Sequence, residues 1–290
     1  MIKKNNKLII NNENLIIGAA CGYNWDDLEI FIKSLRKFLN CRVILIFEQS
    51  LDKRLKNKFK NYKIEYYIYR NINDKNIPGL MNSKSDVGQR RYAMYEYILK
   101  KIKKKPNKVL LTDTRDVVFQ KDLFQNKFKK SINFFLEDEK ILNDSRNSRW
   151  LERTVGYNEY NKIKKNKISC SGTTFGNFEQ ILKYSFLMKK YLFLYPYKRP
   201  LRHLLVFKKV EPYDQGIHNY LIYNNFFKNM KLHKNEFSKI CTTAYMKKFS
   251  FNKKGQLTNK KNEIYSLIHQ YDRSFYKNGL PVFNYKRFYG

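Results

Sequence analysis

The feature that most constrains the fold of this chain is an alternation of short apolar runs with helix-like segments over residues 15–111. The apolar runs have the length of buried strands, and the segments between them carry apolar residues at helical spacing, such as Leu28, Phe31 and Leu35. We predict strands at 15–20, 42–47, 64–69 and 109–111, and helices at 26–38, 51–59 and 88–102. This alternation predicts an α/β fold, with a mostly parallel central sheet and helices on both faces.

The second half of the chain is less regular. We predict a strand at 131–136, a mixed and partly helical region at 146–160, and a strand at 168–176 that glycine turns interrupt. Helices are predicted at 178–195 and 214–223, followed by a weaker tail over 247–290. Because the sequence shows neither an internal repeat nor a Pro- or Gly-rich linker, we expect one domain over residues 1–290 with an irregular C-terminal extension.

The composition indicates a folded and strongly basic protein. With 42% hydrophobic residues over 290 positions the chain can bury a sizeable core, so intrinsic disorder is not expected. Its 59 Lys and Arg against 25 Asp and Glu give a formal net charge of +34. That charge suits a polyanionic partner such as nucleic acid, an anionic membrane surface or a phosphorylated substrate. The amino-acid bias of an AT-rich genome would explain the charge equally well, because Lys is spread along the whole chain rather than gathered in one block.

The cysteines and the hydropathy pattern indicate the cellular compartment in which the protein is expected. The four cysteines form no Cys-x-x-Cys pair, which excludes a zinc ribbon and a thioredoxin-type motif and suits a reducing environment. Residues 1–14 are rich in Lys and Asn and lack the apolar core of a signal peptide, and no run of about 18 apolar residues occurs. We therefore expect a cytoplasmic protein whose charge allows peripheral contact with the inner face of an anionic membrane.

The strongest chemical signal lies where the predicted strand 109–111 ends. Asp113 and Asp116 follow it closely, and ligands bind at the strand ends of open α/β sheets. Two carboxylates at this place could hold a hard divalent cation against a diphosphate. The alternative is structural, because Asp also caps turns and helices. From the residues alone, both interpretations stay open.

The stretch Asp113-Thr114-Arg115-Asp116 resembles the Asp-x-Asp signature of GT-A glycosyltransferases, in which a strand end supplies carboxylates for a metal-bound sugar nucleotide. This resemblance implies a GT-A-like fold with a Rossmann-type sheet, a Mn²⁺ or Mg²⁺ ion, and Arg115 among the donor-binding residues. The motif is one residue longer than the usual pair, which leaves the partner of each carboxylate open. We favour Asp116 for the metal and Asp113 for the ribose or the metal edge. Metal dependence also stays open, because some GT-A enzymes need no metal.

The resemblance extends to the donor side of the implied site. The first predicted strand is followed by a small-residue segment, where GT-A enzymes hold the base and ribose, and the implied donor contacts there are Ala19, Ala20, Cys21 and Tyr23. A plain turn of small residues is the alternative. Arg90 and Arg91 begin the predicted helix 88–102, whose N-terminus favours anions, and could contact the diphosphate. Adjacent helical residues do not share a face, so at most one of the two should point inward.

Two later segments are implied on the acceptor side. Asp214-Gln215 resembles the Asp-Gln pair at a helix start in many GT-A enzymes, where the Asp acts as general base or orients the acceptor hydroxyl. Asp214 would then be the catalytic residue and Gln215 an acceptor contact, although Asp is also a common helix N-cap. Ser171, Gly172 and Thr173 could contact sugar oxygens, because Gly lets the backbone come close and hydroxyls donate. A glycine-kinked strand is the structural alternative.

A late histidine completes the implied metal site. His269 follows an apolar lead-in and resembles the C-terminal His that completes the metal or diphosphate site in many GT-A enzymes. A lone His is more often a packed or surface residue, and that is our interpretation of His203, His218 and His233. His269 differs from them by its order after the Asp cluster and the Asp-Gln pair.

Together these motifs predict one glycosyltransferase domain, with a nucleotide-binding half over 1–125 and an acceptor-binding half with the C-terminal extension over 126–290. The resemblance implies transfer of a sugar from a nucleotide-sugar, a UDP-sugar being favoured, to a hydroxyl of a glycan or glycolipid. Two rival classes stay open: a basic nucleic-acid-binding protein, and a non-catalytic nucleotide-sugar-binding module on the same fold. Nucleic acid is the less expected partner, because the basic run 100–105 lacks interleaved aromatic residues.

Overall fold

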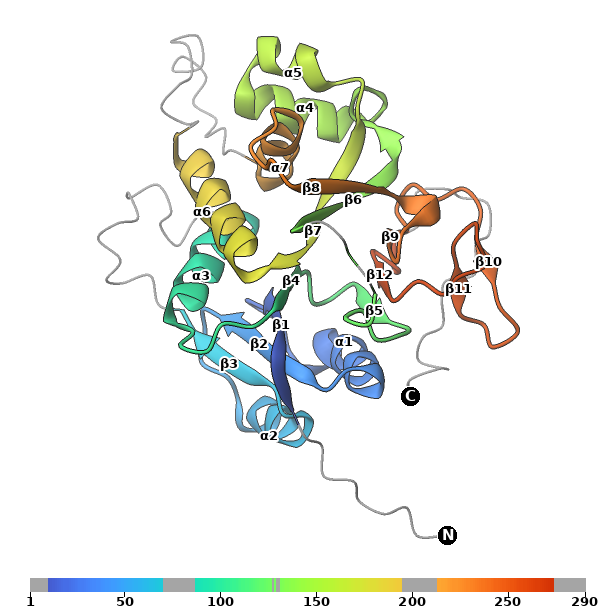
Figure 1. Cartoon of the computed structure of the whole chain (residues 1–290). Coiled ribbons are helices and arrows are strands. Elements are labelled where there is room, and N and C mark those ends of the chain that lie inside the picture. Colours follow the sequence, from blue (N-terminus) through green and yellow to red (C-terminus); the bar gives the residue numbers. More distant parts are fainter. Residues whose placement is uncertain (1–9, 70–86, 127, 129–130, 195–212, 274–290) are drawn as a thin grey trace.

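The computed structural model describes residues 10–69, 87–126, 128, 131–194 and 213–273, which build an α/β fold around a seven-stranded sheet (Figure 1). The strands of this sheet are β1 (Asn11–Ala19), β2 (Cys41–Phe47), β3 (Glu65–Ile68), β4 (Lys108–Thr112), β6 (Ile132–Lys140), β7 (Lys167–Asn177) and β8 (Met230–Lys234). The helices are α1 (Trp25–Phe38), α2 (Lys53–Tyr62), α3 (Val87–Lys101), α4 (Ser145–Val155), α5 (Tyr157–Ile163), α6 (Phe178–Leu194) and α7 (Asp214–Tyr223), with short 3₁₀ turns at η2 (Ile141–Asn143) and η5 (Asn235–Phe237). Among the described residues, no helix has the length and apolar character that crossing a membrane requires.

Helices cover both faces of the central sheet, as the sequence predicts. Alternate strand residues point to opposite faces, so Leu15 and Ile17 of β1 pack with α3, α6 and α7, whereas Ile16 packs with α1 and α2. A capping box begins α1: the Asn24 side chain accepts from the Asp27 backbone N–H, and the Asp27 carboxylate accepts from the Asn24 backbone N–H. The first half of the chain therefore forms the predicted layers from local sequence signals.

The strands of the sheet follow the order β3-β2-β1-β4-β7-β6-β8. β7 pairs antiparallel with β4 and β6, and all other neighbours pair in parallel, so the sheet is mixed although mostly parallel. After β1 the chain builds β2 and β3 on one side, and then returns to place β4 on the other side. This reversal opens a crevice at the carboxyl ends of β1 and β4, which is where ligands bind in such sheets.

A second sheet brings the C-terminal part of the described chain back to the centre of the molecule (Figure 1). It contains β5 (Val117–Phe119), β12 (Leu267–His269) and β9 (Ile240–Thr242), in the order β5-β12-β9. β12 pairs antiparallel with β5 and parallel with β9. A further antiparallel pair joins β10 (Ser250–Phe251) to β11 (Leu257–Thr258). The predicted weak tail therefore contains defined strands, while its last residues, 274–290, lie outside the described residues.

The structure corrects several expectations for the second half. The strand predicted at 168–176 is not interrupted by turns, because β7 runs unbroken over eleven residues. Its glycines serve close packing instead: a Cβ on Gly176 would lie 2.7 Å from the Ser131 carbonyl oxygen. The mixed region 146–160 consists of α4 and α5, and the helix predicted at 178–195 is described only to Leu194. The sequence does not predict β8 and β9, because β8 (Met-Lys-Leu-His-Lys) contains no apolar run and β9 has only three residues.

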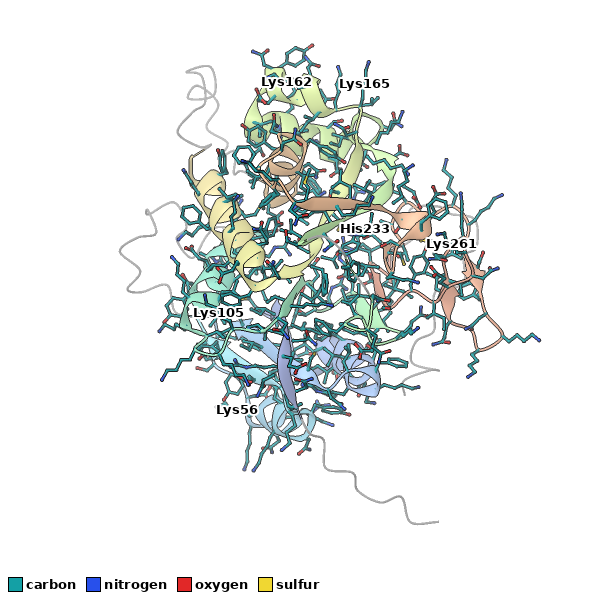
Figure 2. The ribbon with its side chains drawn as sticks, in the orientation of Figure 1. Lys56, Lys105, Lys162, Lys165, His233 and Lys261 are labelled. Carbon is teal, nitrogen blue, oxygen red and sulfur yellow. The ribbon has the colours of Figure 1, made fainter. Side chains whose placement is uncertain are left out.

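Lysines lie on widely separated parts of the described fold (Figure 2). Lys56 lies on α2, Lys105 precedes β4, and Lys162 lies on α5. Lys261 lies in the C-terminal part of the described chain. The spread of Lys along the sequence is thus also a spread over the molecule.

Candidate metal and active site

The turn after β4 carries the two carboxylates of the predicted motif. The backbone N–H of Asp113 donates to the Gly172 carbonyl oxygen in β7 at 2.8 Å. The hydroxyl of Thr114 donates to the carbonyl oxygen of Ala19 at 3.0 Å, which ties the turn to the end of β1. Close approach at this point requires Gly18, because a Cβ there would lie 2.2 Å from Thr114 Cγ2. The turn therefore lies in the crevice between β1 and β4.

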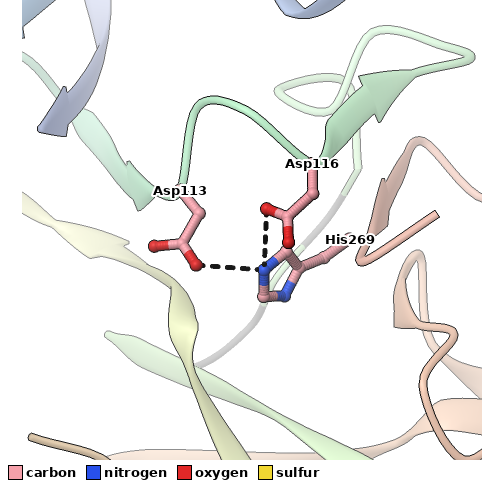
Figure 3. Close-up of side chains that lie close together, drawn as sticks. All are labelled: Asp113, Asp116 and His269. Carbon is pink, nitrogen blue, oxygen red and sulfur yellow. Dashed lines mark hydrogen bonds and ion pairs between the residues drawn. The ribbon is translucent and has the colours of Figure 1, made fainter. Parts of the chain in front are cut away.

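The second sheet brings His269 to these carboxylates (Figure 3). β12 pairs with β5 so that His269 lies opposite Val117, the residue after Asp116. The His269 Nε2 atom lies 3.1 Å from Asp113 Oδ2 and 3.5 Å from Asp116 Oδ1. One ligand atom from each of the three side chains lies within 4.8 Å of the others. Two carboxylates suit Mn²⁺ or Mg²⁺, and the imidazole favours the softer Mn²⁺, so this group of residues fits the implied metal.

The other ring nitrogen of His269 is held from behind. Its Nδ1 atom lies 3.3 Å from the Sγ atom of Cys170, and the His269 side chain is fully buried. A contact at Nδ1 fixes the ring and leaves Nε2 facing the carboxylates. Gly172 leaves room for this arrangement, because a Cβ there would lie 2.3 Å from His269 Cε1 and 2.6 Å from Asp113 Oδ2. The absence of a side chain at this position of β7 is therefore a requirement of the site.

The three groups shift one another's protonation. Burial alone would raise the pKa of Asp113, but Arg91 and His269 outweigh it and hold that pKa well below its usual value. Burial is likewise outweighed at Asp116, whose pKa is lowered mainly by His269. Burial would lower the pKa of His269, yet Cys170 and the carboxylates of Asp116 and Asp113 raise it well above the ordinary value. A metal ion bound here would have to replace the imidazole proton, since a metal ligates the neutral ring.

Arg91 of α3 joins the metal cluster to the acceptor side of the site. Its Nη1 atom donates to Asp113 Oδ1, and its Nη2 atom donates to Asp214 Oδ2 at 2.5 Å. Nη2 also donates to the Ser171 and Tyr92 hydroxyl oxygens, each at 3.2 Å. The Arg91 side chain is only 11% exposed, so its charge is weakly screened by solvent. One buried guanidinium therefore holds the two carboxylates in a fixed relation.

The predicted Asp-Gln pair begins α7 at the same place. The N-cap residue is Tyr213, and Asp214 follows it inside the helix, with its Oδ1 accepting from the Gln215 backbone N–H at 2.7 Å. Burial raises the pKa of Asp214 above its usual value. The Gln215 side chain forms two hydrogen bonds to the backbone of β7: it accepts from the Ser171 N–H at 2.9 Å and donates to the Ser169 carbonyl oxygen at 2.6 Å. This amide fixes α7 against the strand that carries Gly172.

These groups line one pocket of about 400 Å³ at the carboxyl ends of β1 and β4. The predicted site residues in its lining are Ala19, Tyr23, Arg91, Asp113, Arg115, Asp116, Ser171, Gly172, Asp214, Gln215 and His269. Residues from both halves of the chain thus meet at a single cavity, which is large enough for a substrate and carries charged groups of both signs.

The other four predicted site residues are placed outside the lining of this pocket. Arg90 donates to both carboxylate oxygens of Glu48 at 2.6 Å, because adjacent residues of a helix do not share a face. Ala20 is buried among core residues of α1 and β2. Cys21 directs its thiol to a β2 carbonyl oxygen, and burial raises the pKa of that thiol to about 12. Thr173 is fully buried and lies outside the lining.

Sequence reasoning did not find several residues that line the same pocket. They are Glu137 of β6, Arg146, Asn147 and Trp150 of α4, and Tyr245, Gln270 and Arg273. Burial raises the pKa of Glu137 to about 7. The Arg273 Nη2 atom lies 2.8 Å from Asp116 Oδ2. No motif marks these residues, since they lie on elements whose place beside the crevice depends on tertiary packing. The available signal is the closeness of Gln270 and Arg273 to His269 in the sequence.

No protein-family model matches the chain, and a search of curated proteins finds no significant match. A fold by itself does not fix a function, because one fold hosts many activities. The geometry and chemistry of the pocket are therefore the basis for assigning a function.

Proposed function

We propose that this chain is a metal-assisted glycosyltransferase, which moves a sugar from a nucleotide-sugar donor to a hydroxyl group of a glycan or glycolipid acceptor. A UDP-sugar is the favoured donor, and a GT-A-like fold is part of the proposal. One observation supports it above all: Asp113, Asp116 and His269 form a cluster in the same pocket as the half-buried Asp214. That pocket lies where a mostly parallel sheet reverses its strand order, the usual ligand position in such sheets.

On the donor side, the three-residue cluster would hold a Mn²⁺ or Mg²⁺ ion, which when bound neutralises charge on a diphosphate leaving group. Arg91 faces the same space, and its planar guanidinium matches the geometry of phosphate oxygens. Ala19 and Tyr23 line the end of β1, where the base and ribose would lie. Residues of the 1–125 half thus supply most of the proposed donor contacts.

On the acceptor side, Asp214 would accept the proton of the attacking hydroxyl as the sugar is transferred. Burial raises its pKa, which makes the carboxylate a stronger base than an exposed Asp. Arg91 keeps Asp214 ionised and oriented through the Nη2 contact at 2.5 Å. Ser171 and Gly172 of β7 line the pocket between the cluster and Asp214, where the transferred sugar would lie.

Thermal unfolding with a panel of UDP-, GDP- and CMP-sugars tests the donor assignment. A ligand that binds only the native state raises the melting temperature. We expect one nucleotide class to raise it in the presence of Mn²⁺ and to lose that effect when EDTA removes the metal. An unchanged melting temperature across the whole panel would contradict the donor assignment.

Two variants separate the proposed roles. Asp116→Ala should abolish both transfer and the Mn²⁺-dependent rise in melting temperature, whereas Asp214→Ala should abolish transfer and keep that rise. Asp26→Asn is a matched control, because Asp26 is an exposed carboxylate on α1 and should leave both properties unchanged. Near-wild-type turnover in both pocket variants would show that the residue assignment is wrong. Donor binding by the wild type without any turnover would favour a non-catalytic binding module.

A further inference from the structure

The α4 side of the pocket carries an aromatic surface that the proposed donor site does not use. The indole of Trp150 stacks on the ring of Tyr213, with ring centroids 5.5 Å apart and an interplanar angle of 28°. Trp150 is half-buried and lines the pocket. Because Tyr213 directly precedes Asp214, the aromatic pair lies beside the proposed acceptor carboxylate. A broad apolar surface at this place suits a flat ligand with an apolar face.

Asn147 lies one helical turn before Trp150, on the same side of α4. The residue is only 7% exposed and lines the pocket, yet its Oδ1 atom has no hydrogen-bond partner among the described residues. The amide cannot be turned round, because Nδ2 donates to the Asp144 carboxylate at 3.0 Å, and a carboxylate only accepts. Unpaired buried acceptors are rare and costly. Oδ1 is therefore an unpaired acceptor at the α4 wall; the atom itself is buried, so a ligand hydroxyl would reach it only after a shift of the Asn147 side chain.

Close packing of α4 on α7 fixes the position of this wall. A Cβ on Gly216 would lie 2.9 Å from the Trp150 carbonyl oxygen and 3.3 Å from the Leu151 Cα. The Thr154 hydroxyl accepts from the Tyr213 backbone N–H at 3.1 Å and donates to the Trp150 carbonyl oxygen at 2.6 Å. The aromatic pair is thus anchored to the same helix start that carries the proposed catalytic carboxylate.

From these contacts we infer that the α4 wall is the acceptor subsite and holds a pyranose ring, with the apolar face of the ring on Trp150 and a ring hydroxyl donating to Asn147 Oδ1. The inference rests on the proposed function, and it narrows the acceptor to a glycan portion with a pyranose at the transfer site. A nucleotide base could also stack on an indole, but Ala19 and Tyr23 form the base side of the pocket, and they come from β1 and the loop after it. A second ring hydroxyl would then face Asp214.

The fluorescence of Trp150 tests this inference directly. The chain has two tryptophans, and the other one, Trp25, is 4% exposed and stacked on Tyr62, away from the pocket lining. In Trp25→Phe, Trp150 is therefore the only tryptophan that fluoresces. The wild type should show the same change in emission above a constant background from Trp25. Among the methyl glycosides of glucose, galactose, mannose, N-acetylglucosamine and N-acetylgalactosamine, we expect at least one to change the emission. Sorbitol, which has hydroxyl groups but no ring, should not.

Substitutions at two positions separate stacking from hydrogen bonding. Asn147→Ala in the Trp25→Phe background should weaken binding of the active glycoside about three- to tenfold, the range for loss of one hydrogen bond. Trp150→Ala should weaken it by about tenfold or more in calorimetry, and Trp150→Phe should restore part of the affinity. All three α4 variants should keep Mn²⁺-dependent binding of the donor, which controls for folding and for the donor site.

Three results would overturn the inference while donor binding persists. The first is that no glycoside changes the Trp150 emission. The second is that a glycoside does so with the same affinity in Asn147→Ala, and binds Trp150→Ala as tightly as the wild type. The third is that UDP alone changes the emission and no glycoside does, which would assign the indole to the base. Failure of the wild type to bind any donor contradicts the proposed function instead, and the melting-temperature panel measures it separately.

Discussion

At the residue scale, the turn after β4 explains how a motif one residue longer than the usual pair can still form one site. Asp113 presents one carboxylate oxygen to His269 and the other to Arg91. Asp116 does the same with His269 and Arg273. From the sequence we favour Asp116 for the metal and Asp113 for the ribose or the metal edge, and in the folded chain both carboxylates lie within 3.5 Å of the same imidazole nitrogen, His269 Nε2. Each therefore has an oxygen in position for a metal ion.

The metal assignment predicts a specific effect of Asp116→Asn. The substitution keeps the shape of the side chain and removes its charge, so Mn²⁺ affinity measured by calorimetry should fall by at least about tenfold. Asp272→Asn is the matched control, since Asp272 pairs with Arg115 at 2.8 Å and lies outside the cluster. Equal Mn²⁺ affinity in the two variants would argue against the site.

The missing side chain of Gly172 gives a second prediction. In Gly172→Ala the new Cβ would press against His269 and Asp113 inside a packed site. We expect the free energy of unfolding to fall by about 1–3 kcal/mol, the usual cost of overpacking, together with loss of Mn²⁺ binding. Urea unfolding and a Mn²⁺ titration measure the two effects. Ser171→Ala adds no volume and should keep Mn²⁺ binding; full Mn²⁺ affinity in Gly172→Ala would refute the packing argument.

At the element scale, local pattern predicts β1 to β4 with α1 to α3, because the strands are short apolar runs, the helices carry apolar residues at helical spacing, and their alternation indicates a mostly parallel sheet. The sequence of β7 does not indicate that it pairs antiparallel with β4, because the apolar pattern of a strand is the same in both orientations. The elements that carry much of the remaining site are either too short to show a period, as β12 is, or are placed by packing, as α4 is. His269 could be proposed from its order in the chain, whereas Trp150 could not.

The contact between α4 and α7 predicts opposite effects of two helical glycine substitutions. In Gly216→Ala the Cβ meets the backbone of α4, so the free energy of unfolding should fall by about 1–2 kcal/mol in spite of the better helix propensity of Ala. In Gly88→Ala the nearest atom among the described residues, Asp214 Oδ2, lies at an ordinary 3.5 Å, so stability should stay equal or rise slightly. Urea unfolding compares the two variants. A loss of the same size in both would contradict close packing at Gly216.

At the scale of the whole molecule, a buried histidine makes stability depend on pH. His218 lies 2.7 Å from the Tyr184 hydroxyl and 3.0 Å from the Ser169 hydroxyl, and burial lowers its pKa to about 3. An unfolded His titrates near pH 6.5, so below that pH the unfolded chain binds a proton that the native state refuses. The free energy of unfolding is therefore unaffected by the protonation of His218 above pH 6.5, and it falls as pH decreases below that value, by up to about 1.4 kcal/mol per pH unit.

Urea unfolding between about pH 4 and pH 7 measures this slope. His218→Gln removes the titrating group, so its stability should fall less steeply with acid than that of the wild type, whatever its absolute value. His233, whose pKa burial lowers to about 4, acts with the same sign. His269 has the opposite effect on stability. Because its pKa is raised in the native state, its proton stabilises the metal-free native state at low pH, and this stabilisation is lost as pH rises through the raised pKa. An unchanged slope in His218→Gln would contradict the burial argument.

The measurement that tests the central claim most directly is calorimetric titration of the wild-type chain with a UDP-sugar, with and without Mn²⁺, alongside Asp116→Asn. The proposal predicts that the UDP-sugar binds the wild type in the presence of Mn²⁺, that EDTA abolishes this binding, and that Asp116→Asn loses it while keeping the wild-type fold. If the wild type binds neither Mn²⁺ nor any nucleotide-sugar, or if Asp116→Asn binds both as tightly as the wild type, the Asp113, Asp116 and His269 cluster is not the donor site.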